Sequence, residues 1–146
     1  MFAKQRAKGF SLIEIMVVLV IIGMLATLVA PQVLGVLKKG SESRLLSDFA
    51  TIEGALERYK AENYIYPTTE QGLDALVNEP TSEPRPKSWS GYLKKTPKDP
   101  WKNTYQYLNP GETKPYDVYS LGADGLRGGV DEAADVSVWD EPEDNN

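Results

Sequence analysis

The chain has 146 residues, which suits one small domain with an added segment, and its 16 Lys and Arg against 21 Asp and Glu leave a net charge of −5. It contains no cysteine and no histidine. A disulfide framework, a thiol nucleophile and a histidine-based catalytic triad are therefore excluded. The acidic balance also argues against a nucleic-acid-binding protein, which normally presents a basic face.

The first forty residues differ from the rest of the chain. Lys4, Arg6 and Lys8 make the start basic, and no charged side chain occurs from Ile15 to Leu37. About 20 such residues cross a bilayer core as a helix, with the basic end on the cytoplasmic side. The run is longer than the roughly 7–15 apolar residues of a cleaved signal peptide. We therefore expect a retained membrane-spanning helix.

The apolar run continues into an amphipathic pattern, and a helix is predicted from near Phe10 to about Asn63. Gly23 and Pro31 are expected weak points inside it, and the segment before Pro67 is expected to end it. The stripe that indicates the helical spacing consists of Val33, Leu37, Leu45, Phe49, Ile52, Leu56 and Tyr59.

The second half of the chain predicts a small α+β domain. A short helix is expected over Leu73, Leu76 and Val77, with Thr68 or Thr69 as its N-cap, and a proline-rich loop follows. Strands are then expected at 104–108 and 116–121, around a turn at Asn109–Gly111, with a third candidate at 136–139. The many tyrosines and the three tryptophans are expected to cover a thin core on the long helix. The acidic tail from Asp140 is expected to fray.

Glu14 is a carboxylate at the edge of the apolar run, where an unpaired charge is costly. Two interpretations are open from its position. Glu14 either pairs with a positive charge and has a function, or it stays hydrated near the lipid headgroups.

The motif Gly9-Phe10-Ser11-Leu12-Ile13-Glu14, with its basic leader and apolar run, resembles the type III signal of type IV pilins and type II secretion pseudopilins. In that family a prepilin peptidase cuts after the glycine, and the new N-terminal residue is methylated. The resemblance implies cleavage between Gly9 and Phe10 and N-methylation of Phe10. It also implies that Glu14 pairs with the amine of a neighbouring subunit during filament assembly.

The stretches YPTTEQGLDALV, PKDPW and YDVYSLGADG resemble the major pseudopilins of type II secretion in particular. That family commonly has glycine after the DPW tryptophan and proline two residues later, where this chain has Lys102 and Thr104. The resemblance implies a type IV pilin-like fold, with a cleaved leader at 1–9, a transmembrane helix segment at 10–37 and a periplasmic domain at 38–146.

The function that the resemblance implies is structural rather than enzymatic. The chain would polymerise into a helical pseudopilus that drives export of folded proteins across the outer membrane. Its expected partners are copies of itself, minor pseudopilins, the prepilin peptidase, and the inner-membrane assembly platform with its ATPase. One alternative is a type IV pilin of a surface fibre, which the missing cysteine pair disfavours. A membrane-anchored enzyme using Asp124, Asp131 and Asp135 is a further alternative, but it lacks another base or nucleophile.

The segment 121–135 is glycine-rich and acidic. From the residues alone, a solvated acidic turn is favoured over a metal site. The resemblance implies instead that this loop binds Ca²⁺, which prefers oxygen ligands. The implied ligands are the side chains of Asp124, Asp131 and Asp135 and the backbone oxygen of Leu121. The cation would then fasten the C-terminal region as a disulfide does in type IV pilins.

Overall fold

A computed structural model describes residues 9–140, and from 28 to 34 it describes the backbone alone. The basic leader residues and the acidic tail from 141 to 146 lie outside the described residues, so the expected fraying stays a prediction. The chain divides into two compact units, Met1–Lys39 and Gly40–Asn146.

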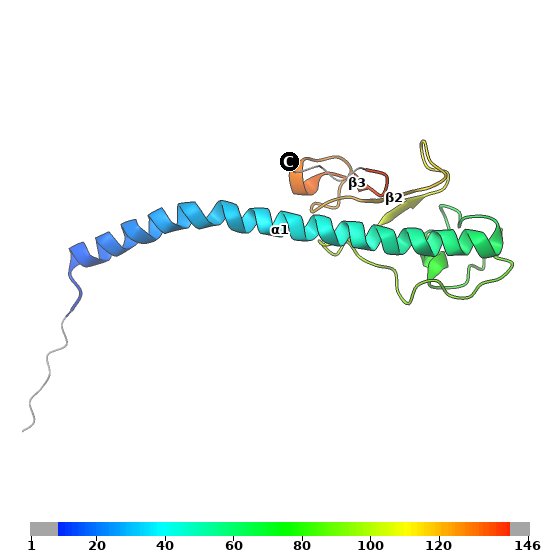
Figure 1. The fold of residues 1–146 in the computed structure, drawn as a ribbon, viewed down its shortest axis with the longest axis horizontal. Helices are drawn as coiled ribbons and strands as arrows, with labels where there is room; N and C mark the ends of the chain where they lie inside the picture. Colours follow the sequence, from blue (N-terminus) through cyan, green and yellow to red (C-terminus); the bar gives the residue numbers. More distant parts are fainter. Residues whose placement is uncertain (1–8, 141–146) are drawn as a thin grey trace, which may run out of the picture. The chain divides into compact units, whose positions relative to one another are not determined.

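Helix α1 runs without interruption from Leu12 to Asn63, coloured from blue to green in Figure 1. The prediction of a helix from near Phe10 to about Asn63 is confirmed, and the helix continues through the expected weak points. Its end is set by Tyr64, which has a φ of 66° and whose N–H still donates to the Lys60 carbonyl at 2.7 Å. A left-handed residue of this kind commonly closes a helix. The chain thus leaves α1 before the restriction imposed by Pro67 takes effect.

In the first unit, the described side chains of α1 are exposed. They include large apolar residues such as Leu19 and Leu25, which are 63% and 56% exposed. Across the described residues, no helix combines the length and the hydropathy that a membrane span requires.

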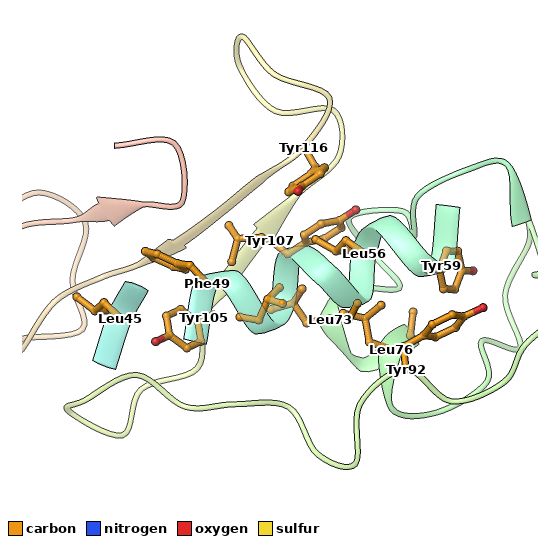
Figure 2. Packing of buried hydrophobic residues seen from close by; sticks show 14 residues of the cluster. Leu45, Phe49, Leu56, Tyr59, Leu73, Leu76, Tyr92, Tyr105, Tyr107 and Tyr116 are labelled. Atoms are coloured by element: carbon orange, nitrogen blue, oxygen red, sulfur yellow. The ribbon is translucent and has the colours of Figure 1, made fainter. Parts of the chain in front are cut away.

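The core of the second unit lies along one face of the later half of α1. Ile52, Leu56 and Tyr59 are completely buried there. Figure 2 shows Tyr59 beside Tyr92 and Phe49 beside Tyr105, with ring centroids 5.2 and 5.4 Å apart. The expectation that aromatic residues cover a thin core is therefore confirmed. The full buried set is Leu45, Phe49, Ile52, Ala55, Leu56, Tyr59, Leu73, Ala75, Leu76, Tyr92, Tyr105, Tyr107, Tyr116 and Val118.

Three short antiparallel strands form the sheet in the order β1-β2-β3. Their bounds are Gln106–Leu108, Asp117–Ser120 and Val136–Ser137. Tyr107 pairs with Val118, and both side chains point into the core. The predicted strands are confirmed in place and order, but each is shorter than expected. Thr104 forms an isolated bridge with Lys98 instead of extending β1, and beyond β3 a single backbone bond joins Val138 to Val118.

The predicted short helix is a single 3-10 turn, η1, from Leu73 to Leu76. Gly72 precedes it, and no side chain caps it, so the expected N-cap at Thr68 or Thr69 is wrong. The Thr68 hydroxyl instead accepts the N–H of Gln71 at 3.2 Å, one turn earlier. A second 3-10 turn, η2, spans Asp131–Ala133 and was not predicted.

We expect the second unit to lose stability as the pH rises through about 10 to 12. Burial and the hydrogen bond to Glu57 raise the pKa of Tyr66 to about 12, and burial also raises the pKa of Tyr59 and Tyr116. Unfolded tyrosines lose their protons near pH 10. The unfolded chain then holds fewer protons than the folded one, so the free energy of unfolding falls. Urea unfolding at successive pH values, followed by tryptophan fluorescence, measures this; a flat profile would contradict it.

Candidate functional site

Gly9 and Phe10 precede α1 in an exposed segment without regular secondary structure. Phe10 is 78% exposed, and the helix begins two residues later, at Leu12. A peptidase needs an accessible, non-helical bond, and the bond between Gly9 and Phe10 meets this requirement. Cleavage there would place a new amine directly before Ser11.

Glu14 lies in the first turn of α1 and is exposed. Its Oε2 accepts the backbone N–H of Ser11 at 3.4 Å, while the Glu14 N–H donates to the Ser11 carbonyl at 3.1 Å. In a capping box, the glutamate three residues after the N-cap accepts the N-cap backbone N–H in the same way. The spacing Ser-x-x-Glu before an apolar run is the sequence signature of this motif. The capping role of Glu14 could therefore have been predicted from the sequence, but it was not. It adds a third interpretation of Glu14 to the two left open above.

The candidate cation loop is the segment 121–135, between β2 and β3. Its two limbs are joined by the Ala123 N–H, which donates to the Glu132 carbonyl at 2.8 Å. A Cβ on Gly122 would lie 2.7 Å from the carbonyl carbon of Ala133, and Gly122 has a φ of 66°. A Cβ on Gly129 would also collide with the Ala133 carbonyl oxygen. Glycine is therefore required at both positions by close backbone approach, and backbone oxygens gather where the limbs meet.

The predicted carboxylates lie on both limbs of this loop. Asp124 is exposed, and its Oδ1 accepts the Leu126 N–H at 2.9 Å. Asp131 opens η2 with a φ of 53°. Asp135 accepts the Gly128 N–H on Oδ2 at 3.0 Å, but its Oδ1 is buried without a hydrogen-bond partner among the described residues. Leu121, whose backbone oxygen is the fourth expected ligand, directly follows β2.

These carboxylates do not converge as a three-member cluster. From residue 9 to residue 140, no group of three or more acidic side chains lies close enough to hold a metal ion. Asp135 faces a cavity of about 190 Å³, which it shares with Asp117, Asp140 and Glu112 and with one cation, Arg127. The expected ligand residues thus share one loop, and the backbone oxygens of Ala133 and Ala134 both lie close to Gly122.

The turn before β1 supports the start of this loop. Asp99 is fully buried, and its two carboxylate oxygens accept the Asn103 N–H and the Ser120 hydroxyl, both at 2.7 Å. Lys102 within this turn has a φ of 77°. The left-handed region favours glycine, which explains physically why the resembling family commonly has glycine there.

Comparisons with known proteins match nearly the whole chain. The family model described as "Type II secretion system (T2SS), protein G" matches residues 32–139, and that of the "Prokaryotic N-terminal methylation motif" matches residues 4–30. Type II secretion system core protein G of Pseudomonas aeruginosa is 52% identical over 139 residues, which cover 94% of this chain and 98% of that protein. The protein of the same name from Vibrio cholerae is 48% identical over 136 residues, 92% and 93% of the two chains.

The chain belongs to the type II secretion system protein G family.

This family assignment makes the chain a major pseudopilin, a structural subunit of the pseudopilus. The fold agrees, since the crystal structure of the major pseudopilin from the type 2 secretion system of enterohaemorrhagic Escherichia coli is similar to it. That match has a TM-score of 0.65 and 39% sequence identity, and covers 73% of this chain and 92% of the other. The long N-terminal helix with a small antiparallel sheet is thus the type IV pilin-like fold. The alternative of a surface-fibre pilin is not favoured, and the family is structural.

The loop of this pseudopilin offers the kind of atoms that Ca²⁺ binds. Calcium takes 6–8 oxygens from carboxylates, carbonyls and water. A buried carboxylate oxygen without a partner is uncommon in folded proteins, and Asp135 Oδ1 has none within the described part of the chain. The backbone oxygens of Ala133 and Ala134 lie close to Gly122 in the same loop. The donor set therefore fits a hard cation, with carbonyls making up for the lack of a carboxylate cluster.

Proposed function

We propose that this pseudopilin is made as a precursor, cut between Gly9 and Phe10, and methylated on Phe10. The segment 10–37 then crosses the inner membrane once and leaves the domain 38–146 in the periplasm. The match of residues 4–30 to the methylation motif carries this proposal. The absence of charged side chains from Ile15 to Leu37 and the exposed apolar side chains of the first unit support it.

In the assembled pseudopilus, the α1 helices of many copies form the core of a helical filament. An apolar helix that leaves lipid for a protein bundle gains little hydrophobic energy, because both surroundings are apolar. Specificity must then come from packing, from periplasmic contacts and from Glu14 pairing with the amine of a neighbour. Minor pseudopilins, the assembly platform and its ATPase are the proposed partners, and filament growth pushes folded proteins through the outer membrane.

Mass spectrometry of the native N-terminus tests the processing route. We expect a mature chain that begins with methylated Phe10 and lacks residues 1–9, because the bond is exposed and precedes the helix. In cells without the prepilin peptidase, the same measurement should find the uncut chain. Retention of Met1 in peptidase-containing cells, or a cut near Ala30, would contradict the proposal.

The second part of the proposal concerns the loop 121–135, which we propose binds one Ca²⁺. Asp124, Asp131, Asp135 and the backbone oxygen of Leu121 would hold it, together with carbonyls between Val130 and Val136. A bound cation supplies a divalent charge that holds the oxygens of both limbs together. The chain has no cysteine for a disulfide, and the oxidising periplasm is where small domains otherwise use one. The observation that supports the site is Asp135 Oδ1, which is buried and finds no hydrogen-bond partner between residues 9 and 140.

Calcium is expected to raise the melting temperature of the second unit by roughly 10 °C at about 100 times Kd, because it binds only the folded loop. Asp124→Asn should reduce this shift. Asparagine still accepts the Leu126 N–H, so the turn survives while a ligand charge is lost. Glu132→Gln is the matched control, since it removes one charge from the same loop at a side chain that is not a proposed ligand. Equal melting with and without calcium would count against the site.

A further inference from the structure

Asn103 lies outside the cation loop, in the turn before β1. It is bonded both to the buried Asp99 in that turn and to Gly122 in the loop. Its backbone N–H donates to Asp99 Oδ1 at 2.7 Å, and its carbonyl accepts the Asp99 N–H at 3.0 Å. These two reciprocal bonds fix the backbone of Asn103 relative to a carboxylate that is completely buried.

The same carboxylate fixes the beginning of the loop. Asp99 Oδ2 accepts the Ser120 hydroxyl at 2.7 Å, and the Ser120 Oγ accepts the Gly122 N–H at 3.1 Å. Asp99 therefore sets the distance between the end of β2 and the turn that carries Asn103. The turn with Asn103 and the end of β2 are thus both bonded to the buried Asp99 carboxylate.

The side chain of Asn103 bonds to the loop before Asp124 and lies beside the glycine that follows it. Its Nδ2 donates to the Gly122 carbonyl at 2.9 Å. Its amide group also lies beside Gly125, 3.5–3.6 Å from the position that a Cβ there would take. Asn103 thus lies next to both glycines that flank Ala123 and Asp124.

The turn that carries Asn103 is attached to α1 by hydrogen bonds on both sides of it. Arg44 donates from Nη2 to the Lys98 carbonyl at 3.1 Å, and the Tyr105 hydroxyl donates to Asp48 Oδ2 at 2.9 Å. These bonds bracket the turn that holds Asn103, one before it and one after it. The turn is therefore held against the helix.

We propose that Asn103 is a positioning residue for the cation site, which orients the Asp124 turn through Gly122 and Gly125 without binding the cation itself. This proposal rests on the proposed calcium site. Residues that orient metal ligands from outside commonly contribute about 10- to 100-fold to metal affinity. A merely structural role would instead lower stability and leave affinity unchanged.

Titration of CaCl₂ into the full chain in detergent micelles, by calorimetry, tests the proposal. We expect Asn103→Ala to weaken calcium binding by about 10- to 100-fold. In calcium-free buffer, we also expect faster hydrogen exchange at the Leu126 amide, which reports on the Asp124 turn. Asn103→Leu, with a similar shape but no donor, serves if the alanine variant does not fold.

Asn109→Ala is the matched control. It too removes an amide-to-carbonyl bond, from Asn109 Nδ2 to the Pro67 carbonyl at 2.7 Å, outside the loop. It should lower the melting temperature and leave calcium affinity within about twofold. If the unchanged chain binds calcium and Asn103→Ala binds it equally well, the positioning role is overturned and the calcium site stands. If the unchanged chain binds no calcium, the site itself is overturned, and the positioning proposal with it.

Discussion

Replacing Leu56 by alanine is expected to lower the free energy of unfolding of the second unit by about 2–5 kcal/mol. Leu56 is completely buried at the centre of the core face of α1 (Figure 2). Truncation removes its apolar contacts and leaves a cavity among rigid aromatic rings. These rings have little freedom to move into the cavity, because several are also held by hydroxyl bonds, such as that from Tyr107 to the Pro67 carbonyl at 2.8 Å.

Leu46→Ala is the matched control for this prediction. It makes the same substitution in the same helix at a side chain that is 49% exposed, and we expect a change within about 0.5 kcal/mol. Urea unfolding followed by tryptophan fluorescence measures both variants, since all three tryptophans lie in the second unit. Equal losses from the two substitutions would show that the core has been placed on the wrong face of α1.

Replacing Glu14 by glutamine is expected to abolish pseudopilus assembly, while the subunit still folds and inserts. Glutamine can accept the Ser11 N–H, so it keeps the capping box, but it has no charge to pair with a neighbour's amine. Leaving a buried charge unpaired costs about 3–5 kcal/mol, roughly a 100- to 4,000-fold loss per subunit contact. Glu14→Ala should fail to the same degree.

The two substitutions together separate assembly from capping. If the role of Glu14 is only to cap α1, Glu14→Gln should assemble normally and Glu14→Ala should not. Electron microscopy of sheared pseudopili and secretion of an exported protein are the measurements. Mass spectrometry of the N-terminus serves as the control that both variants are still processed.

The interpretation of particular residues from the sequence succeeded where the signal was local. Apolar spacing predicted the face of α1 that carries Ile52, Leu56 and Tyr59, and the Asn109–Gly111 turn separated the first two strands correctly. It failed where a tertiary contact replaced a local one. Thr68 caps no helix, because η1 is only one turn long and starts after Gly72. Lys102 gave no sign of its left-handed backbone, since lysine does not prefer that conformation.

The candidate site divides in the same way. Gly9, Phe10, Glu14 and the acidic loop could be located from motifs, since each motif is contiguous in the chain. The capping role of Glu14 could have been recognised from Ser-x-x-Glu as well. The contribution of Asn103 could not, because its bond to Gly122 joins residues that are 19 positions apart, and no spacing rule links them.

The sequence by itself determined the extent of α1, the order of the strands, the absence of disulfides and the family, because helical period, turn residues and contiguous motifs are local properties. Only the tertiary structure decided that Asp99 is buried, that Asn103 bonds to the Gly122 carbonyl, and that Asp135 keeps an oxygen without a partner among the described residues. These depend on which segments pack together across tens of residues, as in the Arg44 to Lys98 bond. Such packing follows from the shape and hydrogen bonding of the whole unit rather than from any one stretch of residues.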